Sequence, residues 1–249
     1  MFTGMNGNVG RFLLISCALL FVSSYFLARI PMADHPIISS AFVIAMALPS
    51  CYYLFGWLGA PRAGSVMLVI GALSVLVEAF AVKTGFPYGG FIYSDALGYK
   101  VLGLVPWTVA FAYVPLLLGS AALASRLLGS ERLRFALGSS ALLLAVDLVV
   151  DPAAVAGGLW TYTGAGAFYG VPLTNFMDWL LTGFVYSNIL FAIAGARMEE
   201  NGSIPVEVSA SLMMALSFWT GFLAWRAMIV PAAIGASMIA FGGYLFYGH

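Results

Sequence analysis

The sequence predicts an all-α fold: a polytopic transmembrane helix bundle of about eight helices, forming a single integral membrane domain over residues 1–249. Hydrophobic residues make up 62% of the chain and charged residues only 8%, whereas a globular domain carries roughly a quarter charged residues. The mean hydropathy is +1.00. Because apolar stretches long enough to cross a bilayer recur along the chain, we expect a multi-pass protein of the cell membrane.

Charge and motif content exclude several other classes of protein. The ten basic and ten acidic residues cancel, so no basic surface predicts a nucleic acid partner. Cys17 and Cys51 lack the C-x-x-C spacing of a zinc site, and the only histidines, His35 and His249, are too few for a di-iron or haem centre. No dinucleotide fingerprint, phosphate loop or nucleophile elbow occurs. We therefore expect neither a metal nor a cofactor.

A hydrocarbon core of about 30 Å requires about 20 apolar residues per helix. The first candidate helix follows Arg11 and exceeds the ~7–15 apolar residues of a signal peptide, so we expect a retained helix. Only a short break, from Trp225 to Pro231, separates the last two candidates, and their merger would leave seven helices. The predicted helices are Phe12–Ala28, Pro36–Leu58, Ala63–Val82, Leu102–Leu127, Phe135–Val150, Thr174–Ala196, Val206–Ala224 and Pro231–Tyr247.

Four acidic residues lie in or at the ends of these spans, where ionisable groups are rare and usually functional. The third and fifth helices end on the same side of the membrane, and the sixth begins there. Glu78 lies near the exit of the third helix, Asp147 and Asp151 at the exit of the fifth, and Asp178 at the entry of the sixth. We therefore expect all four carboxyl groups in one half of the membrane.

The two longest loops, about Lys83–Val101 and Asp151–Leu173, open onto that same side. Both are rich in glycine and aromatic residues: Thr84–Tyr93 reads TGFPYGGFIY, and Thr163–Pro172 reads TGAGAFYGVP. The shared order of Thr-Gly, an aromatic residue, Tyr-Gly and Pro hints at a duplicated pair of helices.

Asp147 and Asp151 are four residues apart, so on a helix they project from one face about 6 Å apart along the axis. Two carboxylates that close in an apolar setting cannot both ionise cheaply, and we expect one of them to hold a proton. A neutral acid beside an ionised base is an arrangement that proton-transfer enzymes use. The alternative is that Asp151, which precedes Pro152, ends the helix and faces the membrane interface.

Glu78 has no polar partner one turn away except Ser74, so it must meet a group from another helix or be protonated. Its alternative role is a hydrogen bond that locks two helices together. Asp178 follows Asn175 near a helix start, where the helix dipole alone favours a carboxylate.

Aromatic residues gather at the ends of these helices, among them Tyr88, Tyr93, Trp160 and Tyr169, and an interfacial belt accounts for most of them. Together with buried acids, however, aromatic faces suit the protonation of an apolar alkene, because they stabilise the resulting cation. That chemistry requires no redox cofactor. A proton-coupled transporter could use the same residues.

Two blocks of motifs resemble the carotenoid biosynthesis membrane protein family, which includes the carotenoid 1,2-hydratases. The first block comprises Glu78, Thr84-Gly85-x-Pro87-Tyr88-Gly89, Tyr93, Leu97-Gly98-x-Lys100, Gly103 and Val105-Pro106, and the second comprises Asp147, Asp151-Pro152, Trp160, Tyr169-Gly170-Val171-Pro172 and Asn175-Phe176. The resemblance covers about residues 76–181. The chain departs from the family pattern at Tyr162, Phe168 and Asp178, which weakens the case for Asp178.

The resemblance implies a cofactor-independent hydro-lyase that hydrates the terminal double bond of an acyclic carotenoid end group to a tertiary alcohol. It implies catalytic roles for Glu78, Asp147, Asp151 and Asn175, and substrate binding by Tyr88, Tyr93, Trp160 and Tyr169. The expected partners are the carotenoid and membrane lipid, with other carotenoid-pathway enzymes as further candidates. The alternatives are a membrane lycopene cyclase and a carotenoid-binding or proton-coupled transport protein that makes no bonds.

Overall fold

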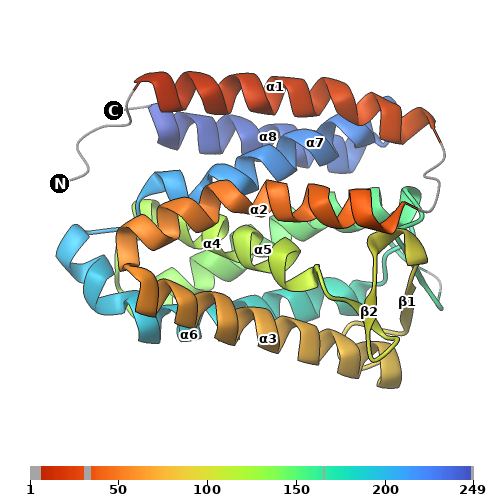
Figure 1. Ribbon diagram of the computed structural model, residues 1–249, viewed down its shortest axis with the longest axis horizontal. Helices are drawn as coiled ribbons and strands as arrows, with labels where there is room; N and C mark the ends of the chain where they lie inside the picture. Colours follow the sequence, from red (N-terminus) through yellow and green to blue (C-terminus); the bar gives the residue numbers. More distant parts are fainter. Residues whose placement is uncertain (1–6, 31–34, 165, 248–249) are drawn as a thin grey trace.

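The computed structural model describes residues 7–30, 35–164 and 166–247, and its main elements are long helices (Figure 1). These are α1 (Gly7–Arg29), α2 (Pro36–Leu58), α3 (Ala60–Thr84), α4 (Val109–Leu128), α5 (Arg132–Ala156), α6 (Leu173–Asn201), α7 (Ala210–Trp225) and α8 (Ile229–Tyr247). A short 3-10 helix, η2 (Val206–Ser209), leads into α7. Counting η2 with α7, eight helical segments of the described chain are long and apolar enough to cross a membrane. The predicted multi-pass bundle is confirmed.

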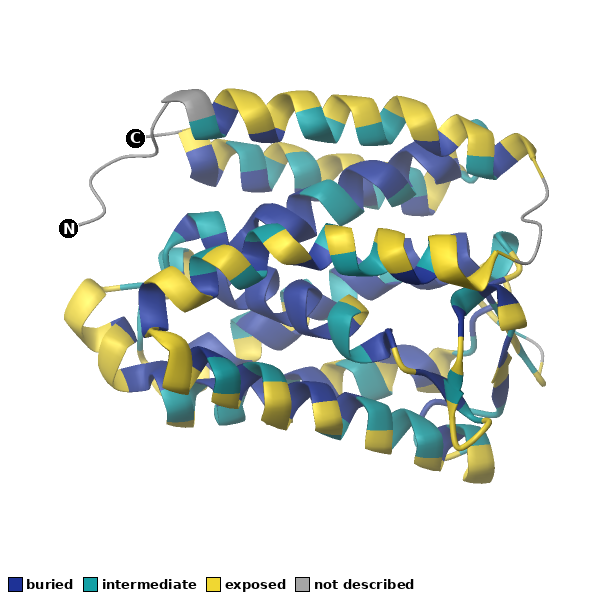
Figure 2. Cartoon of the chain, in the orientation of Figure 1, coloured by how far each residue is buried: buried dark blue, intermediate teal, exposed yellow. Residues whose placement is uncertain are grey.

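Two of the spans form the centre of the bundle. In α4, and in η2 together with α7, 72% of the most apolar stretch of the span is buried inside the protein. In α1 the buried share is only 17%. In Figure 1, α1 and α8 run along one side of the molecule and α3 and α6 along the opposite side, with α4 and α5 between them. Exposed residues cover the outer faces of α1, α2 and α3 (Figure 2), where apolar side chains suit contact with lipid.

Glycines allow the central helices to approach their neighbours closely. A Cβ atom at Gly119 of α4 would collide with the Leu212 side chain of α7, and one at Gly221 of α7 would collide with the backbone of Phe21 on α1. Small residues at such contacts are typical of membrane helices, which associate largely through van der Waals packing. These contacts hold α7 against both α1 and α4.

The structure corrects several predicted boundaries: the first helix begins at Gly7 rather than Phe12, the sixth ends at Asn201 rather than Ala196, and two further changes bear on the site. The fourth helix was expected from Leu102 but begins at Val109, because Leu102 and Gly103 have positive φ angles of 53° and 71° and form a turn. This turn joins two short paired strands, β2 (Lys100–Val101) and β3 (Val105–Pro106). The fifth helix continues past its predicted end at Val150 to Ala156. Membrane helices tolerate an internal proline such as Pro152 when neighbouring groups satisfy the freed backbone.

The last two predicted spans are separate helices. Ala227, in the break between α7 and α8, has a φ of +55°, which interrupts the helical path. The count of eight therefore holds over the described residues, and the alternative of seven does not.

The two glycine-rich loops meet at one end of the bundle. Strand β1 (Phe91–Tyr93), which precedes a 3-10 turn η1 (Asp95–Leu97), pairs antiparallel with β4 (Trp160–Tyr162). Tyr93 lies opposite Trp160 in this register, and Phe91 opposite Tyr162. Figure 1 shows β1 and β2 beside the ends of α2 and α3. The pairing brings aromatic residues from distant parts of the sequence to the helix ends that carry the acids.

Candidate active site

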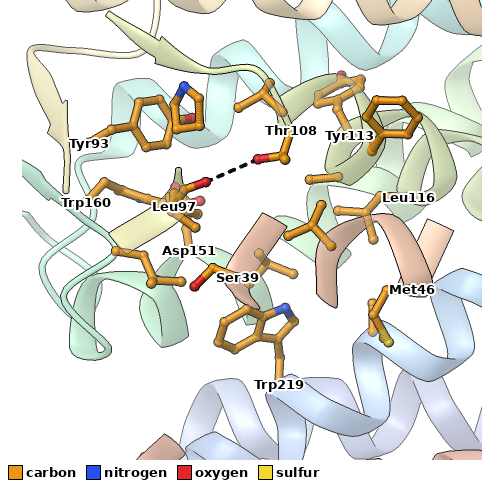
Figure 3. A pocket seen from close by; sticks show the side chains of 18 of the residues that line it. Ser39, Met46, Tyr93, Leu97, Thr108, Tyr113, Leu116, Asp151, Trp160 and Trp219 are labelled. Atoms are coloured by element: carbon orange, nitrogen blue, oxygen red, sulfur yellow. Dashed lines mark hydrogen bonds between the residues drawn. The ribbon is translucent and has the colours of Figure 1, made fainter. Parts of the chain in front are cut away.

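A cavity of about 340 Å³ lies between α2, α4 and α7 and reaches the paired strands β1 and β4. In Figure 3, Asp151, Tyr93 and Trp160 lie on one side of this cavity, and Met46 and Leu116 lie on the other. Its lining is mainly apolar and aromatic. No lysine, arginine or histidine belongs to the lining among the described residues.

Glu78 of α3 reaches the cavity and accepts a hydrogen bond from the hydroxyl of Tyr93 at its Oε2 atom. Strand β1 holds Tyr93 over the last turns of α3, where its ring is almost fully buried. Burial, and then the charge of Glu78, raises the pKa of Tyr93 well above its usual range. The phenol therefore keeps its proton and acts as a donor to Glu78.

Asp147 and Asp151 project from the same face of α5, as their spacing predicted, and both are buried. One side-chain amide on α6 connects them: Asn175 Nδ2 donates to Asp147 Oδ2 at 2.9 Å and to Asp151 Oδ2 at 2.7 Å. Asp147 Oδ1 is buried and has no hydrogen-bond partner among the described residues. Asn175 thus bonds to the Oδ2 atoms of both carboxyl groups, whereas Asp147 Oδ1 receives no hydrogen bond from the described residues.

Tyr162 of β4 provides the second donor to Asp151, with its hydroxyl 2.6 Å from Oδ2. Burial, followed by the charge of Asp151, raises the pKa of Tyr162 above its usual value, so the phenol remains a donor. Each acid that lines the cavity therefore has a tyrosine from one of the two paired strands: Glu78 has Tyr93, and Asp151 has Tyr162.

Three hydroxyl groups form a second polar cluster beside the cavity. Thr182 of α6 donates to the Asp178 carbonyl at 2.7 Å and accepts from Tyr88 at 3.4 Å and from Tyr113 at 3.5 Å. Trp179 lies against Tyr113, with ring centroids 5.0 Å apart. Tyr88, Tyr113 and Trp179 all line the cavity.

Aromatic rings cover the acid-bearing end of the cavity. Tyr93 contacts Trp160 edge-on, with centroids 5.6 Å apart, and Phe91 lies 5.2 Å from Tyr93 and 5.7 Å from Tyr162. Ring faces attract a positive charge, most strongly where water is excluded. This wall can stabilise a cation that forms next to Glu78 or Asp151.

The structure brings most of the predicted site residues together. Six of the predicted site residues line the cavity: Glu78, Tyr88, Tyr93, Asp151, Trp160 and Asn175. Asp147 is not part of the lining but bonds to Asn175, which is. Tyr169 is 40% exposed and does not line the cavity, and Asp178 also lies outside the lining.

Several cavity residues were not among the predicted site residues. The sequence alone is consistent with Tyr162 as one more interfacial aromatic residue, because nothing local indicates that β4 turns it back toward Asp151. Tyr113 and Trp179 lie within long apolar helices, where they resemble ordinary core residues. The cavity residues of α2 and α7 carry no motif. The helical spacing of positions 38, 42 and 46, and of positions 211, 215 and 218, is the sequence signal that could have indicated a shared face on each helix.

No group of three or more His, Cys, Asp or Glu side chains in the described ranges could hold a metal ion. The two cysteines, Cys17 and Cys51, are free thiols on α1 and α2.

The fold and the site define a multi-pass membrane protein in which carboxyl groups from separate helices meet at an apolar, aromatic cavity. The chain belongs to the carotenoid biosynthesis protein family, whose model matches residues 34–241. It is similar to the bisanhydrobacterioruberin hydratase of Haloarcula japonica, with 36% identity over 178 residues. This match covers 70% of the chain but only 60% of that relative's length. No solved structure matches the chain.

Proposed function

We propose that this protein is an enzyme that adds water to the terminal double bond of an acyclic carotenoid end group, giving a tertiary alcohol. The observation that carries the proposal is that Glu78 and Asp151, from different helices, face one apolar cavity. The hydratase named among the similar proteins supports the same reaction class. The reaction needs an acid, a base and a water molecule beside a hydrocarbon, and the cavity offers the first two.

Glu78 is the proposed proton donor. It receives a single hydrogen bond, from Tyr93, and no cationic side chain lines the cavity, so its neutral form fits the surroundings. Its proton forms a C–H bond at the less substituted alkene carbon as the π bond breaks. The positive charge develops on the carbon that bears two methyl groups. Tyr93 then donates its hydrogen bond to the new Glu78 carboxylate.

The aromatic wall stabilises the cation during its short life. Tyr93 bonds to Glu78 and Trp160 packs against Tyr93, and a desolvated cation gains up to about 2 kcal/mol from a good ring contact. The apolar lining keeps other nucleophiles away, so that capture depends on one positioned water.

Asp151 is the proposed base for that water. Two donors, Tyr162 and Asn175, favour its ionised form. Asp147 is its proposed neutral partner, because a second buried charge one turn away would be costly and Asp147 Oδ1 receives no hydrogen bond from the described residues. As the water oxygen bonds to the cation, Asp151 accepts a water proton. That proton returns to Glu78 before the next turnover, so one water is consumed and no proton is lost.

Expression in a lycopene-producing host tests the proposal, with Glu78→Gln and Asp151→Asn as variants. We expect a pigment heavier by one water from the unmodified protein, with its oxygen derived from isotopically labelled water, and a large loss in both variants. Glu200→Gln is the matched control, because Glu200 is half-exposed and pairs with Arg197.

The mass of the product separates the alternatives. Unchanged mass with ring formation indicates a cyclase, and unchanged pigment indicates a binding or transport protein. Oxygen incorporated from molecular oxygen contradicts hydration by acid catalysis.

A further inference from the structure

Part of the cavity is not used by the hydration chemistry. This part, which we call the apolar arm, lies between α2 and α7 and is lined by Ile38, Phe42, Met46, Ala215, Phe218 and Trp219. The three α2 residues recur every fourth position, so they form one stripe along about 12 Å of the helix. The arm carries no charge and is continuous with the acid-bearing end of the cavity.

Hydrogen bonds join α2 to α7 at the inner end of the arm. The Ser50 N–H donates to Ser211 Oγ at 2.9 Å, and the Ser211 N–H donates to Ser50 Oγ at 3.1 Å. The Ser211 hydroxyl donates in turn to the Ala47 carbonyl at 3.2 Å. Since Ser50 and Ser211 are buried, these reciprocal bonds fix α2 to α7 beyond Met46.

The outer end of the arm is held differently. There the rings of Phe42 and Phe218 meet at a centroid distance of 5.0 Å. Phe42 is 37% exposed and Ile38 is 67% exposed, so the α2 stripe continues from the cavity onto the outer surface of the bundle. In a membrane-spanning helix that surface faces lipid.

The volume of the cavity also requires an opening. At about 30 Å³ per water-sized group, 340 Å³ accommodates about eleven such groups, roughly two isoprene units. The whole cavity, the apolar arm included, therefore holds only the end group and the first part of the chain, and the remaining polyene must leave the protein. The apolar arm offers such a route, because its lining residues Phe42 and Ile38 are exposed on the lipid-facing surface.

We propose that the polyene chain of the carotenoid lies in the apolar arm and passes between Phe42 and Phe218 into the bilayer. The identity of this ligand rests on the function proposed above. Only the end group is then enclosed, and the substrate enters sideways from the membrane. Phe42, whose ring packs against Phe218, becomes a residue that contacts the polyene rather than the reacting carbons.

Photocrosslinking tests the position of the polyene. The protein carries p-benzoylphenylalanine in place of Phe42, in phosphatidylcholine vesicles that contain lycopene, and the adduct is identified by mass after irradiation. A variant with the same group in place of Ile38 gives a second reading that leaves the Phe42–Phe218 contact intact. The control carries it in place of Leu68, which is 73% exposed on α3 and does not line the cavity.

We expect lycopene adducts from the probes at positions 42 and 38. The probe at position 68 should give little or no adduct. Equal yields at all three positions would mean that the probe meets only pigment dissolved in the membrane. Either that result or an absence of adduct at positions 42 and 38 overturns the proposal.

A Glu78→Gln background separates this inference from the proposed reaction. The adduct at position 42 should persist there, because binding of the polyene needs no proton. Adduct without any hydrated product from the otherwise unmodified protein refutes the reaction but leaves the apolar arm in place. Hydrated product without adduct at positions 42 and 38 refutes the arm but leaves the reaction in place.

Discussion

Tyr162→Phe is the sharpest test of the role assigned to Asp151. The substitution removes one hydroxyl and leaves a ring of nearly the same size against Phe91. In the structure this hydroxyl lies 2.6 Å from Asp151 Oδ2, and Asn175 supplies the other donor to the same atom at 2.7 Å. The variant therefore reduces the donors at that oxygen from two to one.

The expected loss follows from the charge on the acceptor. A hydrogen bond to a charged group contributes about 1.5–3 kcal/mol, and each 1.36 kcal/mol changes a rate tenfold, so the hydration rate should fall about 10- to 150-fold. If Asp151 takes no part in the reaction, the same substitution costs only stability.

The assay is the initial rate of hydrated carotenoid formation in membranes, normalised to folded protein. Tyr247→Phe is the matched control, because its hydroxyl donates to the Gly10 carbonyl at 2.7 Å, on elements that do not line the acid-bearing end. We expect this control to keep the wild-type rate. Equal rates for Tyr162→Phe, Tyr247→Phe and the unmodified protein would refute the assignment of Asp151 as base.

Three further predictions concern the acids and the helix packing. Glu78→Gln should lower the hydration rate about 10²- to 10⁴-fold, the usual contribution of a general acid, while Glu200→Gln keeps the rate; similar rates in both variants contradict the assignment. Asp151→Asn should reduce the rate more than Asp147→Asn, because Asp151 alone of the two lines the cavity; the reverse order would assign the base to Asp147. Gly119→Val should lower the thermal stability of the purified protein by about 1–3 kcal/mol through overpacking against α7, and an unchanged unfolding temperature would show that the contact is loose.

Local patterns in the sequence were enough to predict the membrane bundle and the side on which the acids lie. Span length and hydropathy predict seven or eight helices, and the parity of the third, fifth and sixth helices places Glu78, Asp151 and Asn175 at the same end. The spacing of Asp147 and Asp151 likewise fixes their common face on α5. Each of these results depends only on composition or on a helical period.

The fourth helix shows where hydropathy fails. Residues 102–108 are apolar enough to extend a span, but the positive φ angle at Gly103 and the pairing of β2 with β3 turn them into a hairpin. Turn geometry and strand pairing depend on backbone conformation, and an average of apolar character along the chain does not report it.

Only the tertiary structure decided which groups meet. Strands β1 and β4 lie about seventy residues apart in the sequence, and their pairing brings the Tyr93–Glu78 pair and the Tyr162–Asp151 pair to one end of the cavity. The apolar arm lies between α2 and α7, which the Ser50–Ser211 hydrogen bonds join at its inner end and the rings of Phe42 and Phe218 join at its outer end. In a membrane, every apolar face of a helix is equally able to meet lipid or protein, so the choice of neighbour rests on small residues and single hydrogen bonds. Such contacts do not recur at a regular spacing in the sequence, so only the folded structure shows which helices they join.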